Sequence, residues 1–152
     1  MVDPIPEWLA AYAQAYENLN QNTLQSDLSP LLCEQIYFED PFNRIHGKTD
    51  TLSLFEHMFA TLQAPKFTVL DMAVGQNGTG YLYWRFDFRY RHRTQQFDGM
   101  SKVAFDTDGR VRSHIDYWDP AKHVYSQIPI LRSLLRFAEQ RLALPQKCKT
   151  RA

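Results

Sequence analysis

The chain has 152 residues, of which 44% are hydrophobic and 14% aromatic, enough apolar material for one globular domain with a buried core. Its 17 basic and 17 acidic residues give a formal net charge of zero, which excludes the overall positive charge typical of nucleic-acid-binding domains. No apolar stretch approaches the ~18 residues that span a bilayer, and the N-terminus has no basic region before an apolar run. We therefore expect a soluble cytoplasmic protein.

The first half of the chain is predicted to be mainly helical. Apolar side chains at helical spacing predict an amphipathic helix over residues 6–20. A second, short helix is expected over about 24–35, followed by an extended segment at 36–39. A third helix is marked by apolar residues over 52–62, and Pro65 is expected to separate it from the strands that follow.

Residues 81–91 give the clearest strand signal in the second half. They alternate strictly, which is typical of an antiparallel strand with one buried face. That face holds Leu82, Trp84, Phe86, Phe88 and Tyr90.

The neighbouring strands are bounded by turn signals. A preceding strand begins near Phe67, and GQNGTG at 75–80 is a turn. RTQQ at 93–96 is expected to turn the chain into the next strand, where one face is shared by Phe97, Gly99, Ser101, Val103 and Phe105. DTDG at 106–109 is a tight turn whose glycine tolerates positive φ, and the last strand is expected over 110–119.

Asp119 and Pro120 are expected to open a C-terminal helix. Its apolar residues are Val124, Ile128, Ile130, Leu131, Leu134, Leu135 and Leu142. This helix either packs on the domain or on a partner subunit, or it lies in the plane of a membrane surface with basic residues on its polar face.

Segregated helices and strands indicate an α+β domain in which helices cover one face of a curved antiparallel sheet. Such an arrangement makes a cone with an apolar interior. The two cysteines, Cys33 and Cys148, lack a CxxC partner and predict free thiols in a reducing compartment. Four scattered histidines lack metal-ligand spacing, so we expect no metal: they are His46, His57, His92 and His123.

Three segments carry a resemblance to the NTF2-like superfamily, which includes ketosteroid isomerases and SnoaL-like polyketide cyclases. They are YFEDPFNRIHG at 37–47, GMSKVAFDTDGRV at 99–111 and SHIDYWD at 113–119. The resemblance covers about residues 6–120. It implies an NTF2-like cone over 1–120, followed by an amphipathic helix and polar tail over 121–152.

The resemblance also implies site residues. Ketosteroid isomerases use an aspartate before a proline as general base, and Asp40 before Pro41 matches it. Aromatic neighbours would make this carboxylate a better base; alternatively, it caps backbone N–H groups of its own loop beside Asn43. Tyr16 lies near the tyrosine of the family's oxyanion hole. Ser101 replaces the family's aspartate there, and its weaker donor argues against steroid isomerisation.

The last strand supplies a second group of candidates. By resemblance, His114, Asp116 and Trp118 face the pocket, although Val111, Ser113, Ile115 and Tyr117 look equally like a buried row. SnoaL-like enzymes similarly use an acidic residue on this strand, which makes Asp116 a candidate acid or base. With His114 it would hold a water or relay a proton; the alternatives are a surface pair or a buried structural hydrogen bond.

We therefore expect a homodimer, paired through the outer face of the sheet, that binds a small apolar molecule. If the protein is an enzyme, the resemblance implies a cofactor-independent isomerase- or cyclase-like lyase or hydrolase. The alternatives are a non-catalytic ligand-binding or dimerisation module and a membrane-associated accessory protein. The apolar wall of the pocket would consist of Phe55, Phe59, Trp84, Phe86, Phe88 and Trp118.

Overall fold

The computed structural model describes residues 3–127 and 129–143, and they fall into two compact units that divide between Trp118 and Asp119. The helices of the first unit are α1 (Ile5–Glu17), a π-helical turn η1 (Leu24–Leu28), a 3-10 turn η2 (Ser29–Leu31) and α2 (Lys48–Thr61). Its strands are β1 (Leu32–Glu39), β2 (Arg44–His46), β3 (Gln63–Val74), β4 (Gly80–Tyr90), β5 (Arg93–Phe105) and β6 (Val111–Tyr117).

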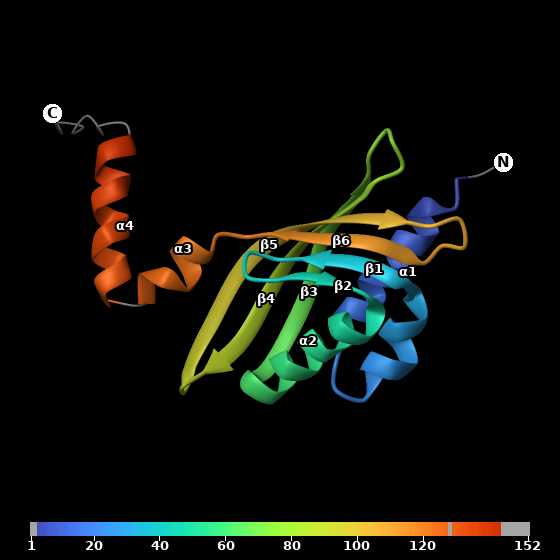
Figure 1. Ribbon diagram of the computed structural model, residues 1–152, viewed down its shortest axis with the longest axis horizontal. Coiled ribbons are helices and arrows are strands. Elements are labelled where there is room, and N and C mark those ends of the chain that lie inside the picture. The colour runs from blue at the N-terminus through green and yellow to red at the C-terminus, as the bar shows by residue number, and fades with distance from the viewer. Residues whose placement is uncertain (1–2, 128, 144–152) are drawn as a thin grey trace, which may run out of the picture. The chain divides into compact units, whose positions relative to one another are not determined.

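The six strands form one curved sheet in the order β2-β1-β6-β5-β4-β3. Helices α1 and α2 cover the same face of it, since Tyr16 of α1 and Phe55 of α2 are in ring contact (Figure 1). The predicted α+β architecture, with N-terminal helices on a curved sheet, is confirmed. One part of the prediction is wrong: β1 runs parallel to β6, so the sheet is mixed and only β3 to β6 form the expected antiparallel meander.

Strand β4 has the predicted buried face along most of its length. Leu82, Trp84 and Phe86 are buried, Phe88 is half-buried and Tyr90 is exposed. The alternation could be read from the sequence because the residues between them are polar or amphipathic and face solvent. On β5, the expected inward positions from 97 to 103 are likewise buried.

The helix expected over 24–35 is shorter than predicted. Helical turns end at Leu31, and residues from Leu32 onward form strand β1. The apolar residues Leu32 and Ile36 are four apart, which suits a helix, yet pairing with β6 and β2 overrides that local spacing.

Two of the predicted boundaries in the sheet are also wrong. Arg91 and His92 make the β4–β5 turn with φ of 49° and 63°, and RTQQ belongs to β5. Pro65 does not separate α2 from the sheet; it lies inside edge strand β3, at a break in register between Gln63 and Lys66, where no ladder hydrogen bond is lost. The turn at 106–109 is as predicted, with Gly109 at φ 80°.

The second unit contains α3 (Pro120–His123), a 3-10 turn η3 (Tyr125–Gln127) and α4 (Pro129–Leu142). The single C-terminal helix that was predicted is therefore two, and Ile128 lies outside the described residues. In α3 the Asp119 carboxylate accepts a hydrogen bond from the Lys122 N–H, as an N-cap does. None of the helices in the described part of the chain is long and apolar enough to cross a membrane.

One close approach in the sheet gives a test of the fold. Gly99 lies opposite Trp84 in the β4–β5 pairing, and a Cβ atom at position 99 would overlap the indole ring. We expect Gly99→Ala to lower the free energy of unfolding by about 1–3 kcal/mol, since overpacking outweighs the ~0.4–1 kcal/mol gained by restricting the unfolded chain. Urea denaturation measures this. Adding Gly99→Ala to a Trp84→Phe protein should lower the free energy of unfolding by less than adding it to the wild type, because the smaller ring leaves room for the new methyl group. A Gly99→Ala protein as stable as the wild type would contradict the packing.

Candidate active site

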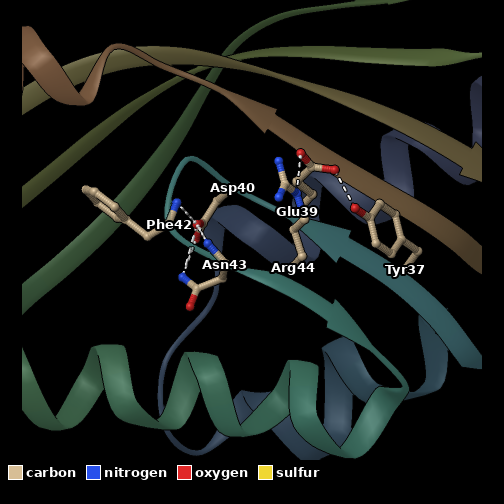
Figure 2. Close-up of polar contacts among 6 residues, drawn as sticks. All are labelled: Tyr37, Glu39, Asp40, Phe42, Asn43 and Arg44. Atoms are coloured by element: carbon tan, nitrogen blue, oxygen red, sulfur yellow. Dashed lines mark hydrogen bonds and ion pairs between the residues drawn. The ribbon is translucent and has the colours of Figure 1, made fainter.

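Asp40 lies in the turn that connects β1 to β2 and holds that turn together. Its Oδ1 atom accepts hydrogen bonds from the backbone N–H groups of Phe42 and Asn43, both at 2.7 Å, and from the Asn43 side-chain amide at 3.0 Å. The same amide lies 3.0 Å from Oδ2. Figure 2 shows the carboxylate inside this turn, so the alternative of a loop carboxylate that caps its own turn describes the geometry.

Its neighbour Glu39 makes different contacts. The Tyr37 hydroxyl donates to Glu39 at 2.5 Å, and the Arg44 guanidinium lies 3.4 Å away (Figure 2). The bond from Tyr37 lowers the pKa of Glu39, and Arg44 adds to the effect. The two adjacent acids of the 37–47 segment therefore have separate structural contacts.

The second set of candidates meets on the inner face of the sheet. His114 is 1% exposed, and its Nε2 atom lies 2.7 Å from Oδ1 of Asp116. Ser101 lies opposite Asp116 in the β5–β6 pairing, and its hydroxyl donates to the same Oδ1 at 2.5 Å. Ser101 in turn accepts a hydrogen bond from the indole N–H of Trp84 at 2.8 Å.

The other nitrogen of His114 contacts helix α1. Its Nδ1 atom lies 2.8 Å from the hydroxyl of Tyr12, and that hydroxyl lies 3.4 Å from the hydroxyl of Tyr16. The imidazole is also stacked between the rings of Phe38 and Tyr16, with centroid distances of 5.0 and 5.4 Å. Position, ring plane and both nitrogens of His114 are thus fixed by α1, β1 and β6.

Asp116 is the end point of these contacts. Oδ1 receives hydrogen bonds from both Ser101 and His114, whereas no described residue is hydrogen-bonded to Oδ2. The side chain is 14% exposed, so it is mostly but not fully removed from solvent. The arrangement therefore fixes one of the two carboxylate oxygens on two neighbouring side chains.

Aromatic side chains continue from this carboxylate across the sheet. Trp118, two residues after Asp116, stacks on Phe97 at 4.7 Å and meets Phe42 of the β1–β2 turn at 5.4 Å. The row continues through Phe88, Phe86, Phe67 and Trp84. Four of the predicted wall residues, Trp84, Phe86, Phe88 and Trp118, therefore lie in one row of packed aromatic side chains. Phe55 and Phe59 of α2 pack elsewhere on the core.

Four of the five predicted catalytic residues therefore lie in one hydrogen-bonded network, and the fifth, Asp40, lies outside it. Ser101, His114 and Asp116 form one hydrogen-bonded network that Tyr16 joins through Tyr12. Asp40 makes no hydrogen bond to this network, although the pairing of Glu39 with Ile115 places it at the end of β1 beside the strand of Asp116.

Two polar partners in this network were not predicted from the sequence: the hydroxyl of Tyr12 and the indole N–H of Trp84. Tyr12 belongs to the apolar spacing that predicts the helix over residues 6–20. The available signal was its position four residues before Tyr16, which puts two hydroxyls on the same buried helix face. Within residues 3–127 and 129–143, no three His, Cys, Asp or Glu side chains are grouped to hold a metal ion.

The buried tyrosines make stability sensitive to alkaline pH. Burial raises the pKa of both Tyr12 and Tyr16 above the usual value of 10.0, and the nearby Asp116 charge adds to this. Below pH 10 both states of the protein keep these hydroxyls protonated. Above it the unfolded chain loses the protons first, so stability falls as pH rises, by about 1.4 kcal/mol per pH unit for each tyrosine.

We therefore expect the stability difference between the wild type and Tyr12→Phe to narrow above pH 10. Chemical denaturation at pH 8 to 11 measures it, with Tyr90→Phe, at an exposed tyrosine, as the control for removing a phenol from the surface. A difference for Tyr12→Phe that is independent of pH would mean that its hydroxyl is not buried in solution.

Comparisons with known proteins agree on the fold. The solved structures that resemble the chain include an NTF2-like protein of unknown function from Exiguobacterium sp. 255-15, 17% identical, covering 74% of this chain and 98% of that one with a TM-score of 0.65. A putative polyketide cyclase from Xanthomonas campestris pv. campestris is 14% identical, with coverages of 78% and 92% and a TM-score of 0.64.

An LEH-like epoxide hydrolase from M. tuberculosis is 16% identical, with coverages of 88% and 96% and a TM-score of 0.64. No curated protein sequence matches the chain significantly. The family model of the SnoaL-like domain matches residues 11–114, a span that includes the second half of α1, all of α2, most of the sheet and His114. The chain therefore belongs to the SnoaL-like domain family, and its fold is that of an NTF2-like protein.

Proposed function

We propose that the protein is a small-molecule enzyme that performs cofactor-free acid–base chemistry with Asp116 as the group that takes and returns the proton. The observation that carries the proposal is the asymmetry of this carboxylate. Oδ1 accepts two hydrogen bonds, and Oδ2 has no partner among the described residues. A base with one anchored and one open oxygen is pre-positioned for proton transfer.

Ser101 and His114 act in this proposal through Asp116. Both donate to the carboxylate before any substrate arrives, so they stabilise and orient it without rearranging. Ser101 is not suited to be a nucleophile, because its hydroxyl donates to Asp116 and the nitrogens of His114 contact Tyr12 and Asp116 instead. The chemistry is thus proton transfer rather than formation of a covalent intermediate.

The proposed substrate is apolar, because the surface next to Asp116 is aromatic. Trp118 is half-buried, stacks on the buried ring of Phe97 and meets Phe42, which is 52% exposed, so Trp118 and Phe42 are the aromatic rings with exposed surface for a carbon skeleton. Structures with this fold include a putative polyketide cyclase and an epoxide hydrolase. A substrate screen should therefore contain polyketide-like ketones with acidic C–H groups, and epoxides, which need an activated water.

The proposed mechanism predicts that Asp116→Asn lowers kcat at least ~100-fold on any substrate found in that screen. Asparagine keeps an oxygen that can accept from Ser101 and His114, and it replaces only the open oxygen and the charge. Steady-state kinetics measures the effect, and a thermal melt shows whether the variant folds. Full turnover by a folded Asp116→Asn protein would eliminate Asp116 as the base.

Asp40→Asn is the matched comparison, since asparagine can also keep the hydrogen bonds from Phe42 and Asn43. The earlier prediction makes Asp40 the base, and a selective loss of kcat in this variant would support it over Asp116. Another outcome is that the wild type binds the screened ketones or epoxides without converting either. If Asp116→Asn and Asp40→Asn then bind them as well, the protein is better described as a non-catalytic binding module.

We further propose that the outer face of the sheet pairs two copies of the chain. Apolar side chains on this face are exposed on β4, β5 and β6, namely Tyr81, Tyr83, Met100 and Tyr117. Tyr81, Met100 and Tyr117 also line a surface groove of about 290 Å³ together with Lys102. Tyrosine and methionine are enriched in protein interfaces, whereas one monomer rarely exposes so many on a single face.

Met100→Glu with Tyr117→Glu should convert the proposed dimer to a monomer, because each charge would be buried twice in a symmetric interface. Light scattering coupled to gel filtration measures the mass. The control is Leu142→Glu, at a side chain of α4 that is 87% exposed. A dimer broken only by Leu142→Glu would place the contact on the C-terminal helix, and a wild-type monomer would refute the pairing.

A further inference from the structure

Two chains of buried hydrogen bonds converge on Oδ1 of Asp116, and their directions can be derived by counting protons. In the first chain, the indole of Trp84 can only donate, so Ser101 must accept from it. The single hydroxyl proton of Ser101 is then used for Asp116 at 2.5 Å. The direction of this chain is fixed by a group that has no alternative.

The second chain runs through His114 and has two consistent directions. Nε2 faces an oxygen of Asp116 that already accepts from Ser101, so its proton points at the carboxylate. Nδ1 faces only the Tyr12 hydroxyl, at 2.8 Å. Either Tyr12 donates to a neutral imidazole, or a protonated imidazole donates to Tyr12.

We propose that Tyr12 is a positioning residue: its hydroxyl donates to Nδ1, so that His114 is neutral and carries its one proton on Nε2, directed at Asp116. The proposal rests on the proposed function only for its catalytic consequence. Tyr12 has one proton, and when that proton points at Nδ1 it is not available for Tyr16. The proposal therefore makes Tyr16 the donor across the 3.4 Å contact between the two hydroxyls. The order is then Tyr16 to Tyr12 to His114 to Asp116, with every donor pointing toward the carboxylate.

The surroundings of His114 favour this order. The groups that contact the imidazole are Tyr12 and Tyr16 of α1, Phe38 of β1 and Asp116 of β6. Burial keeps both phenols protonated and able to donate, so Nδ1 has a donor within reach and needs no proton of its own. A neutral imidazole leaves no buried cation at a position that is 1% exposed. Hydrogen bonds that point the same way along a chain also polarise and strengthen one another, so the hydrogen bond from His114 to Oδ1 becomes stronger.

The direct test is ¹⁵N NMR of the wild-type side-chain nitrogens at pH 7.5, with the other four histidines replaced one at a time so that the remaining signals are those of His114. The proposal expects Nε2 protonated and Nδ1 unprotonated but hydrogen-bonded. A protonated Nδ1 would overturn it, and the test leaves His114 itself unchanged.

Tyr12→Phe should move the Nδ1 resonance toward that of a free lone pair. Tyr16→Phe is the matched control, because it leaves the Tyr12 donor in place and should leave the Nδ1 resonance near its wild-type position. Equal shifts in the two variants would indicate a general disturbance of α1 and contradict a specific role for Tyr12.

The kinetic arm uses whichever substrate Asp116 is found to act on. Tyr12→Phe should lower kcat about tenfold, as expected for one lost hydrogen bond of about 1.4 kcal/mol, with KM unchanged because Tyr12 acts through His114. A raised KM with unchanged kcat would place Tyr12 against the substrate and refute the positioning role. Failure of Asp116→Asn to reduce turnover would sink the proposed function, while the proton positions from NMR would still stand or fall independently.

Discussion

A carboxylate that is largely removed from water on the inner face of a sheet determines how the rest of this domain is arranged. Burial of a charge is costly unless hydrogen-bond donors replace the lost water. Asp116 obtains them from β5 and β6, through Ser101 opposite it and His114 two residues before it. Each of those donors is buried too and needs a partner of its own, which Trp84 and Tyr12 provide. The requirement thus spreads from one strand to β4 and α1.

Helix α1 consequently has two tasks on one face. Tyr12 and Tyr16 contribute apolar ring surface to the core, and their hydroxyls complete the network around His114. Tyrosine serves both purposes because it buries a large ring and keeps a polar tip. No buried side-chain nitrogen or oxygen in the described residues lacks a hydrogen bond, so the network costs the fold little beyond its ordering. Stability alone would be served equally well by phenylalanine, leucine or valine at these positions.

The sequence was informative where local pattern and tertiary environment agree. The alternation in β4 survives because one face meets helices and the other meets solvent. In β6 it fails for a physical reason: Val111 and His114 are both buried although they are three residues apart. The β5–β6 register shifts between Ala104 and Phe105, and a shift of one residue moves every side chain beyond it to the other face. Periodicity therefore could not decide which residues of 110–119 point inward, and the family resemblance was needed to favour His114 and Asp116.

The aspartate–proline pair is a case in which a sequence motif matches the family but the structure gives its residue another role. Asp40 matches a family position, and its carboxylate is engaged with donors at Phe42 and Asn43, so the residue type is accounted for by the turn. Those contacts also hold the backbone of Phe42, whose ring meets Trp118 at one end of the aromatic row. A residue that builds the edge of a site and a residue that transfers a proton in it can share one position in a family. Since Oδ2 of Asp116 has no hydrogen-bond partner among the described residues, the proposed chemistry is placed on β6 and not in the β1–β2 turn.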